Sequence, residues 1–243
     1  MNRLAVCFFY LMPLASVAQI GSVQSLSLGV QPVFRGEKIA LGEPLTLSGG
    51  DTILLHTARI YLGKFVFWKN GQVVFEEKNH YRLLDLEDET TLDLRFDIPE
   101  NLLFDTMQFD LGVDSLTTVS GVMGGDLDPT KGMFWTWQSG YIQVKLEGHI
   151  QGRNDAKPAH STAFQFHLGG YLPPYQTVQT IKIGRFLQPQ HQVSKPSGRW
   201  LHLDLAPFFD AVDWAKKRSI MSPGAEAVRL FGVLSTSFSI HEN

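Results

Sequence analysis

The stretch GMFWTWQSGYIQVKLEG, residues 132–148, carries the clearest indication of the fold. Its first part holds four aromatic residues and a methionine, and its second part alternates apolar and polar side chains as a half-buried strand does. Trp135 and Trp137 are two residues apart, so on a strand they would share one face of the sheet. Packing in a core is the simplest interpretation of such a pair, because aromatic side chains supply much of the buried area in proteins.

Short strands separated by turns are predicted on both sides of this stretch. Residues 52–68 are rich in β-forming side chains, and Asn70-Gly71 follows between two apolar runs, which predicts a hairpin with a type I′ turn. Residues 91–98 alternate cleanly, and Pro99 ends that strand because proline cannot donate to a ladder. Further strands are expected before a turn at residues 35–37 and at residues 108–113, 142–148, 162–168, 177–186, 200–205 and 233–240.

Helix signals are few and lie near the C-terminus. A helix is predicted over residues 207–218, because it would place three apolar side chains on one face. A second helix is predicted over residues 225–231, because Ser222-Pro223 before it has the pattern of a cap followed by a first-turn proline. The chain shows no βαβ alternation, no internal repeat and no long linker. We therefore predict an all-β fold, a single β-sandwich domain over residues 19–243 with one or two short C-terminal helices.

The N-terminus has the pattern of a secretory signal peptide. Arg3 precedes an apolar run over residues 4–14, and the small residues 16–18 fit the cleavage rule, which predicts a signal peptide over residues 1–18. The mature protein would be periplasmic or extracellular. The apolar run is too short to span a membrane, and no later segment is long enough. Cleavage also removes Cys7, the only cysteine, so the mature chain would have no disulfide and no thiolate ligand.

Composition and motifs argue against several classes of function. The net charge is -3 without a basic cluster, which disfavours nucleic acid as a partner. The sequence has no GxSxG motif of serine hydrolases and no HExxH motif of zinc proteases. A glycosidase remains an alternative, because its two catalytic carboxylates can be far apart in the sequence. It has no CxxCH motif, so the chain carries no covalently attached haem. We expect a monomeric binding protein rather than an enzyme.

Two features of the chain suggest ligand-binding chemistry. The acidic loop at residues 124–130 resembles a calcium loop, but the sixth position would be Lys131 and the twelfth Trp137, where glycine and glutamate are needed. An Asp-Pro turn is therefore the prediction. Among eight scattered histidines, His167 is the most interesting because it precedes a glycine pair, where the backbone can approach another group closely. His202 is a second candidate, with Asp204 on its side of the strand.

Several phrases together resemble one family of exported proteins. They are residues 109–115 (FDLGVDS), 124–129 (GGDLDP), 132–141 (GMFWTWQSGY) and 164–170 (FQFHLGG), with 221–223 (MSP) and 231–233 (FGV) near the end. The combination is similar to the MbnP-like proteins, the exported copper-binding family first associated with methanobactin operons. Within that family it most resembles the branch found in Bacteroidetes-type bacteria. The resemblance spans most of the mature chain, and the phrase at 132–141 is its most specific part.

The resemblance implies a copper site that forms after a covalent change. In characterised relatives, a di-haem enzyme of the MbnH/MauG type, related to cytochrome c peroxidases, oxidises a tryptophan to kynurenine. The kynurenine amine and histidines then bind one copper ion. The matching positions are Trp135 and Trp137 for the modification and His167 for the metal. Copper accepts imidazole nitrogen, and Cu(I) also accepts thioether sulfur such as that of Met133.

The source of a second imidazole is an open question in the sequence. The loop over residues 116–131 contains no histidine, so the second ligand would come from His202, His56 or His149, none of which lies in a matching motif. Two other interpretations of the tryptophan pair also remain. The pair would serve as a stacking platform in a surface module that binds glycan or protein, or both indoles would be buried in the core with the function elsewhere.

Overall fold

The computed structural model describes residues 22–78, 80–137, 140–152, 161–184 and 199–242. The predicted signal peptide, residues 1–18, lies outside the described residues, so its cleavage stays a prediction. Within the described ranges, every helix is too short or too polar to cross a membrane.

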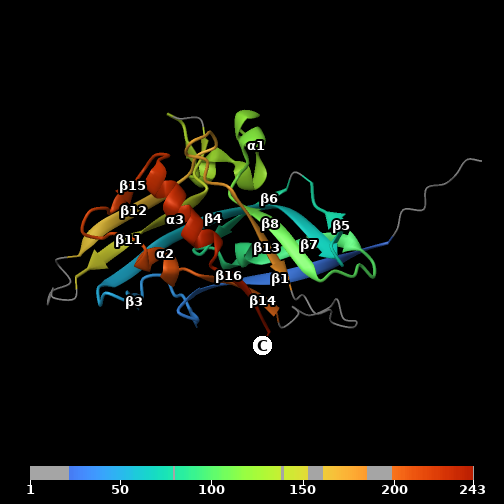
Figure 1. The fold of residues 1–243 in the computed structure, drawn as a ribbon, viewed down its shortest axis with the longest axis horizontal. Coiled ribbons are helices and arrows are strands. Elements are labelled where there is room, and N and C mark those ends of the chain that lie inside the picture. Colours follow the sequence, from blue (N-terminus) through green and yellow to red (C-terminus); the bar gives the residue numbers. More distant parts are fainter. Residues whose placement is uncertain (1–21, 79, 138–139, 153–160, 185–198, 243) are drawn as a thin grey trace, which may run out of the picture.

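Strands dominate the structure, and the helices are short (Figure 1). The strands are β1 (Val23–Phe34), β2 (Glu37–Lys38), β3 (Pro44–Thr46), β4 (Thr52–Lys69), β5 (Gln72–Glu76), β6 (Tyr81–Asp85), β7 (Asp93–Pro99), β8 (Thr106–Leu111), β9 (Phe134–Trp135), β10 (Gly140–Tyr141), β11 (Val144–Gln151), β12 (Thr162–Leu168), β13 (Gln179–Gly184), β14 (Arg199–Asp204), β15 (Ser219–Ile220) and β16 (Phe238–Glu242). The helices are α1 (Ser115–Val119), α2 (Ala206–Asp210) and α3 (Ala225–Ser235), with 3-10 turns η1 (Glu89–Leu92), η2 (Gly125–Leu127) and η3 (Pro129–Lys131).

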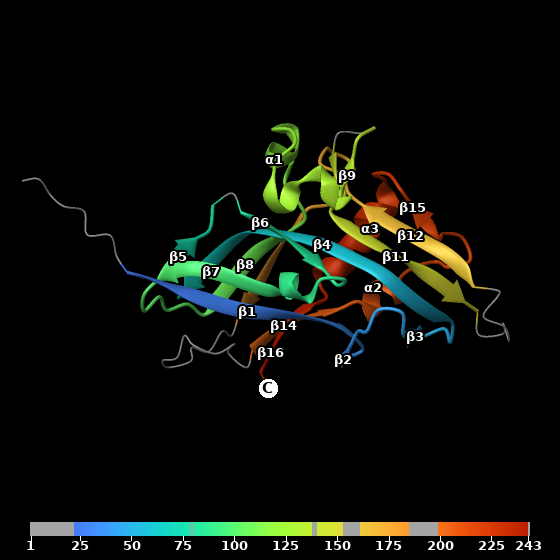
Figure 2. The ribbon, with the colours of Figure 1, turned by 180° about the vertical axis from the view of Figure 1, so that it is seen from behind.

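The strands form two main sheets and one small ribbon. The first sheet has the order β16-β14-β1-β2, and β7 also pairs with β1. The second sheet has the order β13-β8-β4-β11-β12-β15, and β3, β5 and β6 pair with the long strand β4. The ribbon consists of β9 and β10. Seen from behind, β1 and β7 lie in front of β4 and β8 (Figure 2). The predicted β-sandwich fold is confirmed.

The main core lies between the sheets and is rich in phenylalanine. Phe65 of β4 contacts Phe96 of β7 with ring centroids 4.9 Å apart, which joins the two sheets. Alternate residues of β11 are buried, as its sequence pattern predicts. Phe208 of α2 and Phe231 of α3 are fully buried and close the core beside β12 and β13.

The predicted hairpin after β4 is confirmed. Asn70 and Gly71 have φ values of 50° and 78°, so both central residues adopt the left-handed conformation that a type I′ turn requires. Lys69 pairs with Gln72 across the turn. The local sequence therefore fixes the register between β4 and β5.

The helix predictions were correct in position but not in length. The helix predicted over residues 207–218 ends at Asp210, and just beyond it the indole nitrogen of Trp214 donates to the carbonyl of Phe209 at 3.0 Å, which satisfies a carbonyl at the helix end. The helix α3 runs to Ser235, four residues past its predicted end, so the last strand begins at Phe238 instead of residue 233. The short helix α1 was not predicted from the sequence.

Candidate functional site

The segment between β8 and β11 covers the outer face of the second sheet. It contains α1, η2, η3 and the β9-β10 ribbon, and in Figures 1 and 2 it projects from the side opposite the C-terminus. Beneath it lies a second hydrophobic cluster, separate from the main core. Its buried members are Tyr61, Tyr81, Leu83, Val113, Leu127, Met133, Trp135, Tyr141 and Ile142.

Asp126 attaches this segment to the sheet. Its Oδ2 atom accepts from the backbone N of Leu83 at 3.1 Å, and its Oδ1 atom accepts from Nζ of Lys131 at 2.6 Å. The hydroxyl of Tyr61 donates to the Asp126 carbonyl at 2.8 Å. Asp128 accepts from the backbone N of Thr130 at 2.8 Å, which is the predicted Asp-Pro turn. Both carboxylates therefore have structural partners within the segment.

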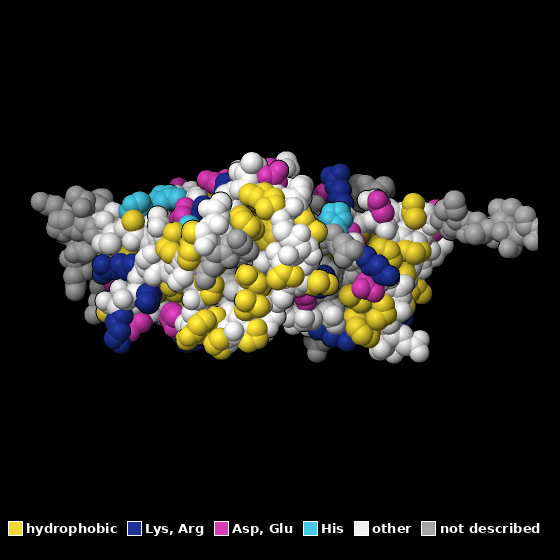
Figure 3. Space-filling model, turned by 90° about the horizontal axis from the view of Figure 1, so that it is seen from above, with side chains coloured by type: hydrophobic (Ala, Val, Ile, Leu, Met, Phe, Trp, Pro, Cys, Tyr) yellow, Lys and Arg dark blue, Asp and Glu magenta, His cyan; other side chains and the backbone are white. Residues whose placement is uncertain are grey.

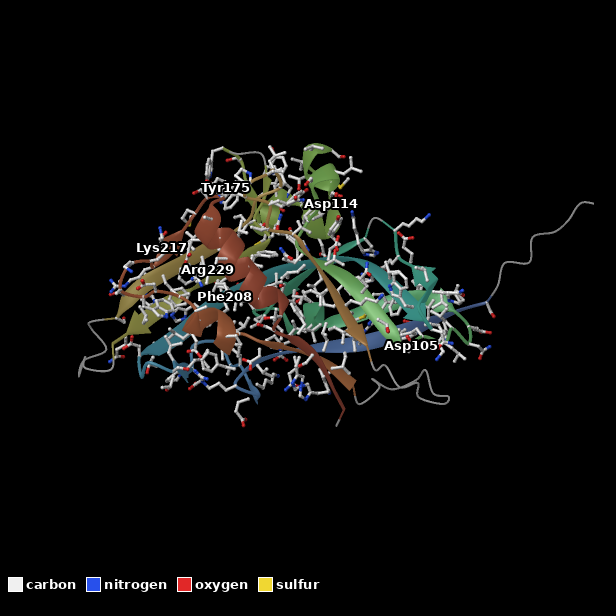
Figure 4. All side chains as sticks on the ribbon, viewed as in Figure 1. Asp105, Asp114, Tyr175, Phe208, Lys217 and Arg229 are labelled. Atoms are coloured by element: carbon white, nitrogen blue, oxygen red, sulfur yellow. The ribbon has the colours of Figure 1, made fainter. Side chains whose placement is uncertain are left out.

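Asp114 anchors the other end of the segment as the N-cap of α1. It accepts hydrogen bonds from the Tyr81 hydroxyl and from the backbone N of Thr117, and Lys64 lies 3.0 Å from it. Burial opposes ionisation, but these donors outweigh it and hold the pKa of Asp114 well below its usual range. In Figure 4, Asp114 and Tyr175 both lie on the upper side of the molecule, where α1 also lies.

The two tryptophans lie in different environments although their rings are neighbours. Trp135 is 5% exposed and pairs with Gly140 in the β9-β10 ribbon, whereas Trp137 is 64% exposed. The strand β9 ends at Trp135, so the expectation of two indoles on one strand face is wrong. Their ring centroids are 5.9 Å apart with planes tilted by 48°. The buried Nε1 of Trp135 has no hydrogen-bond partner among the described residues.

A glycine beside the end of β12 makes room for the Trp135 ring. A Cβ atom at Gly169 would lie 2.9 Å from Cζ3 of Trp135 and 2.6 Å from the carbonyl oxygen of Tyr141. Gly169 follows His167 by two residues, and positions at that spacing in an extended chain lie on one face. The Trp135 ring therefore packs against the chain just beyond β12, two residues after His167.

His167 is buried and has a fixed orientation. Its Nε2 atom lies 2.6 Å from Oε1 of Glu147, which projects from β11 beside it. Burial lowers the pKa of His167, and nearby Lys145 lowers it further, while the Glu147 contact opposes them. The neutral imidazole donates its Nε2 proton to Glu147, which leaves the lone pair on Nδ1. Carboxylates orient metal-binding histidines in this way.

The free energy of unfolding is expected to depend on pH through the buried imidazole of His167. The unfolded chain binds a proton at this residue near pH 6.5, whereas the folded chain keeps it neutral to lower pH. The unfolded state therefore binds more protons, and the free energy of unfolding falls as the pH decreases below about 6.5. Urea unfolding of wild type and of His167→Gln at several pH values measures this dependence. If the free energy of unfolding of the variant falls with decreasing pH as steeply as that of wild type, the prediction is contradicted.

The other predicted histidines lie in two pairs, each made of side chains from two different strands. His202 is on β14 of the first sheet, where its ring stacks on that of His241 with centroids 4.0 Å apart. Asp204 accepts from the backbone N of Arg35 at 3.1 Å and from that of Ala206 at 2.9 Å, so these hydrogen bonds go to the backbone and not to His202. His56 and His149 lie together on the second sheet, with ring nitrogens 3.1 Å apart.

The structure adds Glu147 to the predicted site. Nothing in the sequence around Glu147 marks it, because its contact with His167 depends on the pairing of β11 with β12. In the part of the chain that the structure describes, no three or more histidine, cysteine, aspartate or glutamate side chains are grouped to hold a metal. A metal site here would therefore need ligands of another kind beside His167.

The exposed surface around Trp137 is apolar. Other large hydrophobic residues exposed on this segment are Leu116 and Val119 of α1 and Val122 and Met123 after it. Figure 3, seen from above this segment, shows hydrophobic side chains gathered over the middle of the face. An exposed apolar area of this kind is typical of a surface that contacts another protein.

Comparison with known proteins agrees with this description. The family model for MbnP matches residues 23–222, which include both tryptophans of the covering segment and His167. This chain belongs to the MbnP family. The fold is similar to the solved structure of MbnP from Methylosinus trichosporium, with a TM-score of 0.60 and 18% identity over 91% of this chain and 99% of that chain. No curated protein sequence matches. The MbnP resemblance predicted from residues 109–170 is confirmed, while its Bacteroidetes-type branch stays a prediction.

Proposed function

We propose that this MbnP-family protein is exported and binds copper after a partner di-haem enzyme has oxidised Trp135 to kynurenine. The observation that carries the proposal is the buried Trp135 indole, which packs against Gly169 two residues beyond His167 and has an Nε1 atom without a hydrogen-bond partner among the described residues. The chain itself acts as a substrate of that oxidation and as a metal carrier. It performs no catalysis in this proposal.

Three side chains offer ligand types that suit a copper ion. Opening the indole ring keeps its nitrogen as an aryl amine, so the ligand nitrogen would derive from Nε1. His167 supplies a neutral imidazole whose tautomer is fixed by Glu147. Met133 is fully buried in the same cluster and offers a thioether, a ligand that suits Cu(I). Bound copper would supply redox or storage chemistry, while these residues hold and orient it.

Trp137 gives the partner enzyme access to the buried indole. Its ring is exposed and lies 5.9 Å from that of Trp135, so an electron can leave the buried ring through the surface one. The apolar residues on α1 and after it provide an area for docking. This geometry disfavours the alternative of a glycan platform, because only one of the two indoles is exposed and the planes are tilted.

Peptide mapping by mass spectrometry tests the proposed modification. The mature chain is expressed in the periplasm with and without a di-haem enzyme of the MbnH/MauG type. We expect a gain of about four mass units on the peptide of Trp135 only when the enzyme is present. Trp135→Phe should show no gain, and Trp137→Phe should be modified more slowly at Trp135. An unmodified Trp135 in the presence of active enzyme would refute the proposal.

A further inference from the structure

A pair of histidines on the second sheet brings two ring nitrogens together. Nε2 of His56 on β4 and Nδ1 of His149 on β11 are 3.1 Å apart, and the ring planes are at 73°. The side chain of His56 is exposed and that of His149 is half-buried, so solvent reaches the pair. The two residues are 93 positions apart in sequence, and only the pairing of β4 with β11 places them together.

A β-bulge aims these two side chains at each other. The register between β4 and β11 shifts between Glu147 and Gly148, so His56 is the extra residue opposite this step. The strands approach closely at the bulge, since a Cβ atom at Gly148 would lie 2.1 Å from the carbonyl oxygen of Leu54. Bulges often redirect a side chain at a functional position. Here the bulge places His56 beside His149 on the outer face.

We propose that His56 and His149 form a surface site for a divalent transition-metal ion, with Cu²⁺ bound most tightly. Two metal–nitrogen bonds of about 2.0–2.1 Å that meet near a right angle place their nitrogen atoms about 3 Å apart. The observed separation of 3.1 Å fits that requirement. Imidazole suits copper, nickel and zinc, and affinity rises toward Cu²⁺ along the first row. Water molecules fill the remaining positions because the site faces solvent.

This site is independent of the proposed kynurenine site. His167 lies opposite Lys145, whereas His149 lies opposite Ala163, four residues farther along β11. Glu147 lies between them on β11 and its Oε1 atom contacts His167. The histidine pair needs no oxidised tryptophan and no partner enzyme. Metal binding there is therefore testable on the chain expressed alone.

Calorimetric titration of the mature chain, expressed without a di-haem enzyme, tests this proposal with Cu²⁺ alone and with Zn²⁺ alone. We expect His56→Ala and His149→Ala each to weaken binding of both ions by more than about tenfold, because each removes one of two ligands. Electron paramagnetic resonance of the Cu²⁺ form should show coupling to two imidazole nitrogens in wild type and to fewer in each variant. Both side chains are at least partly exposed, so we expect the variants to fold, and circular dichroism checks this.

The second histidine pair of the chain provides a matched control. The rings of His202 and His241 are stacked with planes at 13°, so their nitrogen atoms do not converge on one point. The double variant His202→Ala/His241→Ala should bind both ions as wild type does. Metal binding that is unchanged in His56→Ala/His149→Ala, or lacking in the wild-type chain, would overturn the proposal. Neither result would bear on the oxidation of Trp135.

Discussion

Replacing His167 with alanine is expected to weaken copper binding by the modified chain by more than about a hundredfold, because it removes a direct ligand. The imidazole is buried, neutral and held by Glu147 at 2.6 Å, so its orientation is fixed before the metal binds. Glu147→Gln should weaken binding less, by about tenfold to a hundredfold, because it disturbs only the orientation of the ring. Competition with a chromophoric chelator measures both affinities.

The His167 experiment needs a background without the histidine pair. It is therefore carried out in the His56→Ala/His149→Ala chain, where copper at the surface site does not obscure the result. His80→Ala is a matched control, since His80 is exposed and its Nδ1 atom lies 3.4 Å from Oε1 of Glu77. It should leave the copper affinity unchanged. An affinity that survives the loss of His167 would mean that the metal is bound elsewhere.

Replacing Gly169 with valine is expected to destabilise the protein by about 3 kcal/mol, at the upper end of the usual cost of overpacking. The first atom of the new side chain would lie 2.6 Å from the backbone oxygen of Tyr141 and 2.9 Å from the Trp135 ring. The backbone atom belongs to the β9-β10 ribbon, so the covering segment must move to relieve the contact. Urea unfolding measures the loss of stability.

Gly124→Val is the matched control for Gly169→Val. Gly124 lies in the same covering segment and is exposed, and a Cβ atom there would meet no other atom within 4 Å. Its free energy of unfolding should therefore change by less than about 0.5 kcal/mol. Similar stabilities for the two variants would show that the Trp135 ring does not depend on the space left by Gly169.

Much of the fold could be predicted because the strands carry local signals. Alternating side chains marked β7 and β11, and Asn70-Gly71 marked the hairpin after β4. The end of α2 could not be predicted, because the residues after it keep a helical apolar spacing, and the contact of Trp214 with the carbonyl of Phe209 leaves no local pattern. The helix α1 has only five residues, too few to show a helical period.

The candidate site was only partly visible in the sequence. Trp135 and His167 were marked by the phrases that resemble the MbnP family, whereas Glu147 and the His56–His149 pair depend on contacts between strands. The expectation that Trp135 and Trp137 share a strand face was wrong, since β9 ends at Trp135. The end of β9 depends on the turn that follows it and on the packing of Trp135 in the second hydrophobic cluster. Neither leaves a local pattern in the sequence.

The copper content of the chain before and after oxidation tests the central proposal most directly. The His56→Ala/His149→Ala chain, purified with and without coexpression of the di-haem enzyme, is dialysed against copper and a weak chelator. We predict one bound copper ion per chain in the form whose Trp135 has been converted to kynurenine and none in the unmodified form. Equal copper content in the two forms would contradict the proposal that the oxidised Trp135 and His167 hold the metal together.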